Sequence, residues 1–508
     1  MSIVNRLNDR RYGILFSYLN TGTNMVCGLL ISSFLLRMLG STEYGLYKTM
    51  SSFVGMLVMF EFGTGTVMTR NITLSKSKKQ KETEIKRNIS TIWGITIILA
   101  IIILVIASIF YFSLEKVYIH SMSYDQIEKC KTIFIFVTIN LIVAFLSQTL
   151  NGIILAYEYY SYASIISIFT IITRALLLIL VLLKYDNAIA VSIIDAVIGT
   201  IVLVITIYFC IKGCNVKFTL KLFDKTIFIN SLPLCIAIFM QTVVNQMNNN
   251  IDNFLIGIKL NPESVALYSV GLYVFSIFSS ATTIPISLYA PQVITDIGEG
   301  KRGKELTKTL VQPSRLIAIV GGSILFGFIV AGKEFITIVY GKEYIKAWYV
   351  ALLLMIPMFI NMTSGVVVNV LDGLNKRIAR SYVLILTTLL NFILTIIWLD
   401  KWGIMGASVA TAVSTIIGQI IIMHIYYSRK IGIHVFYLFR EAYRGILVFQ
   451  IISMVGSLII KQFFINVVSS FFVSAVVYVV VFFSLYILFG VNSEEKKVIK
   501  GYIRKVKR

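Results

Sequence analysis

The fold is decided by the stretch Leu35-Leu36-Arg37-Met38-Leu39-Gly40-Ser41-Thr42-Glu43-Tyr44-Gly45-Leu46-Tyr47-Lys48. Two apolar segments, 12–36 and 44–68, flank its turn, and each has about the 20 residues that a helix needs to cross a bilayer. The second segment carries Lys48 and Glu61 within its apolar run. A charge at the bilayer centre costs about 2.5–3.5 kcal/mol on insertion scales, so it is tolerated where it faces protein or water. The stretch therefore predicts a helical hairpin in a membrane protein with a polar interior.

The composition extends this prediction to the whole chain. Of the 508 residues, 57% are hydrophobic and 14% are charged, and the mean hydropathy is +0.85. Soluble domains carry about 25% charged residues, so the composition predicts an all-α polytopic membrane protein. The net charge of +22 does not indicate nucleic-acid binding, because the basic residues lie between apolar segments, mostly on one side of the membrane.

Fourteen apolar segments are long enough to be spans, and the connections between them are too short to fold as catalytic domains. They cover approximately residues 12–36, 44–68, 89–113, 130–152, 161–183, 188–211, 227–258, 264–290, 314–335, 347–371, 380–399, 404–427, 445–460 and 467–489. With the N-terminus in the cytoplasm, 33 of the 46 Lys and Arg residues are cytoplasmic, 11 are external, and Lys48 and Arg174 lie within spans. Because Lys and Arg are enriched in cytoplasmic loops, this bias predicts that both termini are cytoplasmic.

An internal repeat is indicated at an offset of 221 residues. At this offset Leu46-Tyr47 matches Leu267-Tyr268, and Leu150-Asn151-Gly152 matches Leu371-Asp372-Gly373. Because each set of six spans is even, both sets enter the membrane from the same side and form parallel repeats. The predicted parts are a six-helix bundle at 1–211, a linker at 212–226, a second six-helix bundle at 227–430, two additional helices at 431–490 and a basic tail at 491–508. All six prolines lie in the second half, where bent helices are expected.

The seventh span carries a stripe of polar residues. Gln241, Asn245, Asn248 and Asp252 follow one another at steps of 4, 3 and 4 residues, so they share one helical face. Such a face lines a water-filled cavity or forms an interface with another helix. Interhelical hydrogen bonds, worth about 0.6 kcal/mol on average in membranes, are the structural alternative. We predict that the three amides line a cavity.

Three cations are candidates for binding an anionic headgroup. Arginine binds phosphate bidentately and lysine supplies a compact positive charge. Lys48 and Arg174 come from different spans, so together they suit a diphosphate in a polar cavity. Arg37 is assigned to the same site, with a snorkelling position at the membrane interface as the alternative.

Three carboxylates are candidates for ion coupling, because burial favours the protonated form of a carboxyl group. They are Asp252, Glu61 and Asp195. For Glu61 and Asp195, pairing with a nearby cation is the alternative. The three histidines and five cysteines form no group with metal-ligand spacing, so neither a metal site nor a cofactor is predicted beyond a coupling Na⁺ or H⁺.

The sequence resembles the multidrug/oligosaccharidyl-lipid/polysaccharide (MOP) flippase superfamily, and within it is most similar to the Wzx-like polysaccharide transporters. Five stretches in order along the chain carry the resemblance: Leu39-Gly40-Ser41-Thr42-Glu43-Tyr44-Gly45-Leu46-Tyr47, Glu61-Phe62-Gly63, Ile251-Asp252-Asn253-Phe254-Leu255-Ile256-Gly257, Tyr340-Gly341-Lys342-Glu343-Tyr344 and Gly403-Ile404-Met405-Gly406-Ala407-Ser408.

The resemblance implies two six-helix bundles and alternating access. It also implies that an undecaprenyl-diphosphate-linked oligosaccharide moves from the inner to the outer leaflet of a bacterial cytoplasmic membrane, for O-antigen or capsule synthesis. Membrane lipids and other membrane proteins of polysaccharide assembly would be its partners, and nucleic acid would not. The resemblance implies that transport uses an ion gradient. Asp252 matches an acidic position that is often seen in the seventh span of family members. No covalent bond changes in such a reaction, so no catalytic residue is expected.

Three alternatives stay open. A flippase of peptidoglycan lipid precursors and a multidrug exporter belong to the same superfamily. The two cations within spans weigh against the exporter, whose cavity should be acidic. The third alternative is a membrane-embedded polymerase or glycosyltransferase, which would need an acid/base or metal-binding constellation in a sizeable loop. The product separates the classes, because transport leaves the lipid-linked sugar unchanged and a polymerase lengthens it.

Overall fold

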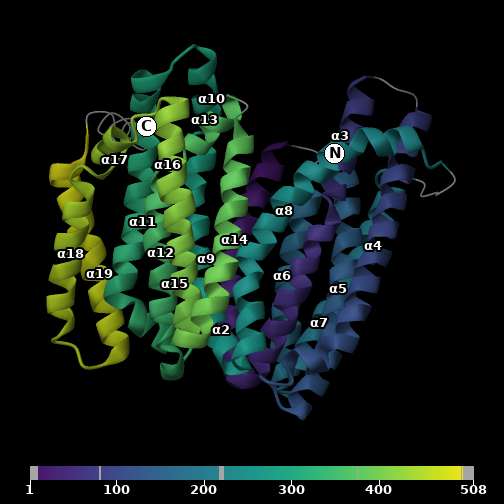
Figure 1. Cartoon of the computed structure of the whole chain (residues 1–508), viewed down its shortest axis with the longest axis horizontal. Coiled ribbons are helices and arrows are strands. Elements are labelled where there is room, and N and C mark those ends of the chain that lie inside the picture. The colour runs from purple at the N-terminus through teal and green to yellow at the C-terminus, as the bar shows by residue number, and fades with distance from the viewer. Residues whose placement is uncertain (1–9, 79–81, 217–221, 375, 493–494, 496–508) are drawn as a thin grey trace. The chain divides into compact units, whose positions relative to one another are not determined.

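The computed structural model describes residues 10–78, 82–216, 222–374, 376–492 and 495, which form helices and turns without a β-strand (Figure 1). Their contacts divide the chain into two compact units, residues 1–266 and 267–508. The elements of the first unit are α2 (Arg10–Leu57), η1 (Val58–Glu61), α3 (Thr64–Ser77), α4 (Glu82–Tyr118), α5 (Tyr124–Ala156), α6 (Tyr160–Leu182), α7 (Ala188–Lys212), α8 (Lys225–Lys259) and the start of α9 (Pro262–Leu288). Those of the second unit are the rest of α9, α10 (Ala290–Gly298), α11 (Gly303–Val339), η2 (Lys342–Tyr344), α12 (Ala347–Thr363), α13 (Val367–Gly373), α14 (Arg377–Trp402), α15 (Ile404–Thr415), η3 (Ile416–Ile422), α16 (Met423–Tyr426), η4 (Tyr427–Ile431), α17 (Val435–Tyr443), α18 (Ile446–Lys461), α19 (Val467–Leu485) and η5 (Tyr486–Gly490).

The helices confirm a polytopic membrane fold. Among the described residues, 11 helices are long and apolar enough to cross a membrane, or 13 if each of two bent pairs is one span. One of the 11 is the 56-residue stretch Gly22–Ser77. A straight helix of that length would measure about 84 Å, against about 40–45 Å for a whole bilayer. The stretch is broken at Gly40, which has φ 73° and ψ 176°. The break lies at the predicted turn, and the total of fourteen spans stays a prediction.

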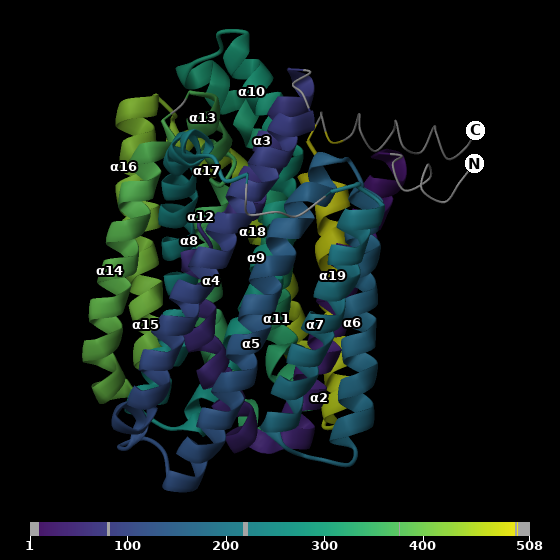
Figure 2. The same ribbon diagram turned by 90° about the vertical axis from the view of Figure 1, so that its right-hand side faces the viewer.

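In the first unit, α5 packs along α7 and α3, and α2 packs against α6, α8 and α5 (Figure 2). The helix α8 begins where Asp224 accepts hydrogen bonds from the backbone N–H groups of Thr226 and Ile227. The bond from Thr226 is the main reason why the pKa of Asp224 lies below its usual value, and the bond from Ile227 adds to the effect. Because α8 contacts α2, α3, α4 and η1, it belongs to this compact unit. The predicted second six-helix bundle at 227–430 begins with this segment. That division describes the sequence repeat, and it stays a prediction.

Small side chains let α8 and the start of α9 approach α2 closely. A Cβ added at any of three positions on these helices would crowd an atom of the facing one. The facing pairs are Gly45 with Pro262, Gly257 with Thr49 and Gly55 with Asn250. Residue numbers rise along one side of this seam and fall along the other, so the helices run antiparallel. Close contact through glycine is the usual way in which membrane helices gain packing energy.

In the second unit, α11 is the central helix, in contact with α12, α17, α18 and α19. The predicted additional helices correspond to α18 and α19, and a buried arginine joins their ends to α11. The Nε atom of Arg315 lies 3.1 Å from Glu495, and its Nη2 donates to the carbonyl of Gly490 at 3.0 Å. Its Nη1 donates to the carbonyl of Glu441 in the last turn of α17 and to that of Arg444, the residue after the helix. One guanidinium therefore satisfies the ends of two helices. Most of the predicted tail lies outside the described residues.

Candidate functional site

The motif around Gly40 forms a junction between helices. Glu43 forms an ion pair with Lys129 on α5 and accepts a hydrogen bond from the backbone N–H of Ala188 at 3.0 Å. Ala188 begins α7, so the Glu43 carboxylate caps that helix and opposes the positive end of its dipole. Thr42 donates to Glu263 at the start of α9. Positions 42 and 263 differ by 221, which is the offset of the proposed repeat.

A charged cluster lies next to this junction and contains two of the predicted site residues. Arg174 on α6 contacts Asp195 on α7 through two hydrogen bonds, from Nε at 2.6 Å and from Nη2 at 3.0 Å. The Tyr47 hydroxyl on α2 donates to the same carboxylate at 2.7 Å. The Asp195 side chain is 10% exposed and that of Arg174 is 31% exposed. The structure therefore places Arg174 and Asp195 together, as an ion pair with one partly open cation.

Lys48 follows Tyr47 on α2, and its ammonium lies 5.4 Å from the ring centroid of the buried Tyr44. Among the described residues, nothing forms a hydrogen bond with Lys48 Nζ or with Arg174 Nη1. Both predicted cations therefore keep donors that an anionic ligand can use.

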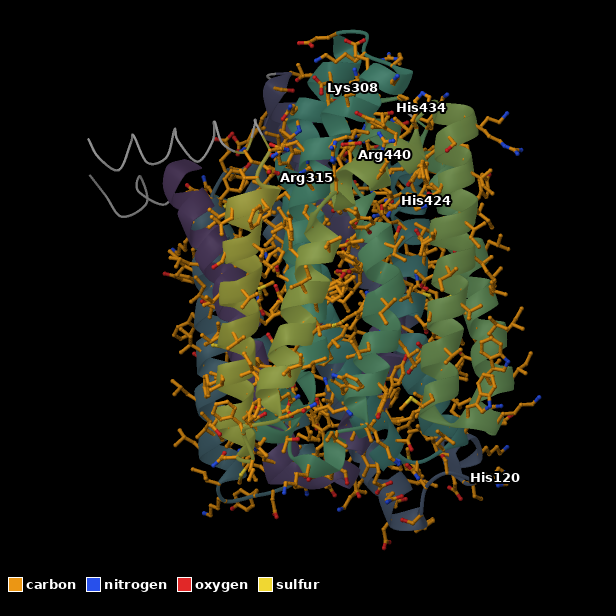
Figure 3. All side chains as sticks on the ribbon, turned by 90° about the vertical axis from the view of Figure 1, so that its left-hand side faces the viewer. His120, Lys308, Arg315, His424, His434 and Arg440 are labelled. Carbon is orange, nitrogen blue, oxygen red and sulfur yellow. The ribbon has the colours of Figure 1, made fainter. Side chains whose placement is uncertain are left out.

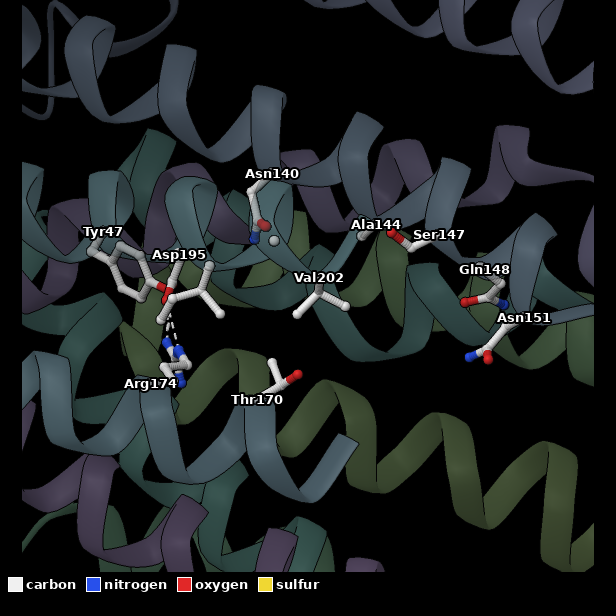
Figure 4. Close-up of a pocket in the computed structure, with 12 residues that line it drawn as sticks. Tyr47, Asn140, Ala144, Ser147, Gln148, Asn151, Thr170, Arg174, Asp195 and Val202 are labelled. Carbon is white, nitrogen blue, oxygen red and sulfur yellow. Dashed lines mark hydrogen bonds and ion pairs between the residues drawn. The ribbon is translucent and has the colours of Figure 1, made fainter. Parts of the chain in front are cut away.

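The cluster forms one end of a pocket of about 500 Å³ inside the first unit, with polar and apolar side chains in its lining. Figure 4 shows polar side chains spread along the pocket from Tyr47 and Arg174 at one end to Asn151 at the other. Its lining comes from α2, α5, α6 and α7. The lining residues are Tyr47, Asn140, Ala144, Ser147, Gln148, Asn151, Thr170, Arg174, Asp195, Ile198, Gly199 and Val202. We call this pocket the trough.

Sequence reasoning missed the α5 wall of the trough. Asn140, Ser147, Gln148 and Asn151 recur at helical spacing, so they form one polar face like the predicted face of the seventh span. From Asn140 to Asn151 this face is about 16 Å long. The periodicity rule applied to Gln241–Asp252 would have found it. The α5 face differs from the stripe in having no ionisable residue where the stripe has Asp252.

The repeat offset extends to the trough. At 221 residues, Asn140, Gln148, Asn151 and Thr170 correspond to Asn361, Asn369, Asp372 and Asn391. Three further polar positions therefore agree with the offset that was proposed from two short matches, one of which already includes Asn151 and Asp372. The charged cluster itself is not repeated, because Arg174 corresponds to Thr395 and Asp195 to Ile416. The first unit alone carries the ion pair.

The other predicted residues lie away from the trough lining. Arg37 is exposed, three residues before the Gly40 break. Glu61 ends η1, where Phe62 and Gly63 adopt left-handed backbone angles and Phe62 stacks on Phe239 of α8. The structure therefore does not bring Arg37 and Glu61 to the charged cluster, and their predicted roles stay predictions.

The stripe on α8 changes its surroundings along its length. Gln241 and Asn245 are exposed, Asn248 is half-buried, and Asp252 is buried with 2% of its surface exposed. The four residues share one face of α8, as the spacing predicts, but only the first half of that face is exposed. Asp252 lies in the part of α8 that packs on α2, between Asn250 and Gly257, which face Gly55 and Thr49 of α2.

This gradient predicts the reactivity of introduced cysteines. Cysteine at position 245 is expected to react readily with a water-soluble maleimide, and cysteine at position 252 is expected to be silent. Four of the five natural cysteines, Cys130, Cys210, Cys214 and Cys235, are buried, and the half-buried Cys27 is replaced by serine in the background. Mass spectrometry of labelled protein in membranes measures both, with cysteine at the exposed Asp186 as the positive control. Equal labelling at positions 245 and 252 would contradict the prediction.

The sequence matches the model of the polysaccharide biosynthesis protein family over residues 11–291, more than half of the chain. The chain belongs to this family. It is 27% identical over 175 residues to a protein of Haloferax volcanii named "Probable low-salt glycan biosynthesis flippase Agl15". That match covers 34% of this chain and 36% of the relative, so the chain aligns with about a third of it.

Two solved structures share the fold of this polysaccharide biosynthesis family member. The lipid II flippase MurJ, in an inward closed conformation, has a TM-score of 0.70 at 16% identity, covering 93% of this chain and 99% of that one. An inward-facing multidrug resistance MATE family transporter of the MOP superfamily has a TM-score of 0.60 at 11% identity, covering 83% and 96%. The predicted all-α fold is confirmed, and the family match agrees with the resemblance to polysaccharide transporters. These proteins are named as flippases and transporters and not as enzymes, in agreement with the predicted class.

Proposed function

We propose that this protein moves a lipid-linked glycan between the leaflets of a membrane. The family assignment and the fold support a polysaccharide flippase. The trough is the observation that carries the proposal, because it offers hydrogen-bonding groups to a glycan within the helical bundle. Each sugar hydroxyl that enters hydrocarbon without a hydrogen bond costs several kcal/mol. A glycan therefore crosses only along a wet, polar surface.

The trough has the chemistry that such a substrate requires. The amide and hydroxyl side chains of Asn140, Ser147, Gln148 and Asn151 can donate to and accept from sugar hydroxyls. At one end, Arg174 Nη1 offers a donor to phosphate oxygens, and Lys48 is the second cation that we assign to the headgroup. We propose that the headgroup is a diphosphate on undecaprenol, and that the lipid tail stays in the bilayer. Neutral hydrogen-bonding groups next to cations favour this substrate over a cationic drug.

The test is a leaflet assay with purified protein in proteoliposomes. The probe is an undecaprenyl-diphosphate-linked oligosaccharide with a fluorescent label on its glycan, and dithionite outside the vesicles destroys the label in the outer leaflet. With protein present, we expect the inner-leaflet signal to be lost as well, with the lipid-linked sugar unchanged by mass spectrometry. A lengthened glycan would indicate a polymerase, and an inner-leaflet signal that survives would contradict the proposed function.

The same assay tests the proposed ion coupling through Asp252. Its buried carboxylate is expected to respond to an imposed H⁺ or Na⁺ gradient, so Asp252→Asn should abolish the acceleration that a gradient gives to the unmodified protein. Asp186→Asn, which removes an exposed carboxylate, is the matched control and should leave the acceleration intact. Unaltered transport by Asp252→Asn at every imposed gradient would refute the coupling role.

A further inference from the structure

The second unit has breaks in helices at positions where the first unit has none. The helices α12 and α13 are bent by 50° relative to each other across residues 364–366. The span that begins with α15 continues as the π-helical segments η3 and η4 around α16. Such π-helical segments are rare and occur frequently at functional sites. The repeat offset of 221 makes a direct comparison possible.

In the first unit, the residues corresponding to the break are 143–145, in the middle of the continuous helix α5. Ser364 in the break corresponds to Val143, and His424 in α16 corresponds to Leu203 in the regular helix α7. The first repeat therefore has the apolar pair Val143 and Leu203 in two unbroken helices. At the same positions, the second repeat has a serine and a histidine in two distorted helices.

The polar pair is a direct contact. The Nε2 atom of His424 lies 2.8 Å from the Oγ atom of Ser364, which is 2% exposed. The Ser364 hydroxyl also donates to the carbonyl of Asn361 at 3.0 Å, a group whose helical partner is lost at the break. A hydroxyl has one hydrogen to donate, so His424 Nε2–H is the donor to Ser364. The imidazole thus supports a serine that satisfies the broken end of α12.

Neighbouring elements hold both partners. The His424 ring lies edge-on to Phe439 of α17, at 5.2 Å between centroids, and Figure 3 shows His424 within the helical part of the chain. The last residue of α12, Thr363, accepts a hydrogen bond from Tyr443 at the end of α17. On the other side of the break, Asn369 donates to the carbonyl of Ile286 in α9 at 2.9 Å.

We propose that the His424–Ser364 hydrogen bond is a latch that holds the break between α12 and α13 in its bent form, and that α13 moves relative to α12 when the latch opens. A few residues between two packed helices are the usual site of a hinge. The α12–α13 break has Gly365 at its centre, and its only side-chain support from α16 is His424 among the described residues. This hinge belongs to the second repeat alone.

The test is hydrogen–deuterium exchange of the full chain in lipid nanodiscs, without substrate, so its outcome is independent of the proposed transport activity. The variant Ser364→Val/His424→Leu copies the apolar pair of the first unit. Exchange at residues 364–374 is expected to become about threefold to fifteenfold faster, the range that membrane hydrogen bonds of average to maximal measured strength allow. Exchange in α5 and α18 should stay unchanged.

Two single variants test whether the faster exchange comes from loss of this hydrogen bond or from a general loss of packing. Ser364→Ala and His424→Ala should each accelerate exchange at 364–374, with the larger effect for Ser364→Ala, which also removes the bond to Asn361. Adding His424→Ala to Ser364→Ala should change little, because the bond between the two residues is already lost. His424→Gln keeps a donor near the position of Nε2 and should restore most of the protection. Ser408→Ala, a buried serine bonded within its own helix, and His434→Ala, an exposed histidine, are the controls. Unchanged exchange in the double variant, or additive effects of the two alanines, would overturn the latch.

Discussion

Replacing Arg174 with glutamine is expected to stop transport and to lower the free energy of unfolding by about 3 kcal/mol. Breaking a buried ion pair typically costs about 3–5 kcal/mol, because the remaining charge loses its partner. The lower figure applies here, since the Arg174 side chain is 31% exposed and Tyr47 still donates to Asp195. Thermal unfolding of purified protein measures the stability, and the leaflet assay measures transport.

The double variant Arg174→Gln/Asp195→Asn separates stability from binding. It removes both charges of the pair and leaves Lys48 in place, so its stability is expected to recover most of what Arg174→Gln loses. Its transport should stay absent, because the headgroup has lost a cation. Normal transport by this double variant would mean that Arg174 serves the fold alone.

A second ion pair supplies the matched control. Lys461 on α18 and Glu334 on α11 lie 2.7 Å apart and are similarly buried, with exposed fractions of 20% and 16%, but they are outside the trough. Glu334→Gln should therefore reduce stability as Arg174→Gln does while transport continues. If both single variants lose transport in proportion to stability, the effect of Arg174 is explained by folding.

The charged cluster shows how far sequence reasoning reached. Lys48, Arg174 and Asp195 were identified because ionisable groups within a membrane are costly and are retained for a reason. The sequence did not reveal that Arg174 and Asp195 pair, since this depends on which helices touch. Yet these residues lie almost symmetrically about the α6–α7 turn at 183–187, so an antiparallel hairpin places them at the same depth. That symmetry was a usable signal.

The stripe on α8 shows the limit of periodicity. The steps of 4, 3 and 4 residues identify a common face, but they do not say what covers it. Gln241 and Asn245 are exposed and Asp252 is buried, because only the second half of the face meets α2. Burial is set by a partner more than a hundred residues away in the chain. Such long-range contacts are absent from a helical pattern, whereas the position of a helix break at Gly40 is local and was found.

Replacing Gly45 with alanine is expected to destabilise the protein strongly, although alanine is the better helix former by about 0.8–1.0 kcal/mol. A Cβ atom at this position would overlap the backbone carbonyl of Pro262, which is not a flexible side chain and cannot turn aside. The start of α9 would have to move, and the bond from Thr42 to Glu263 would be strained with it. We expect a lower unfolding temperature and a smaller yield of folded protein.

Gly22 provides the control in the part of α2 that precedes the Gly40 break. Among the described atoms, none lies within 4 Å of a Cβ built there, so Gly22→Ala should leave the unfolding temperature unchanged or raise it slightly. The two substitutions are chemically identical and both lie in helical backbone, so the difference between them measures the close approach of α9. If Gly45→Ala behaves like Gly22→Ala in a thermal unfolding assay, the junction around Gly40 does not depend on this contact. The strong effect expected at Gly45 would explain why glycine stands there in the motif: its missing side chain makes room for the turn that joins α8 to α9.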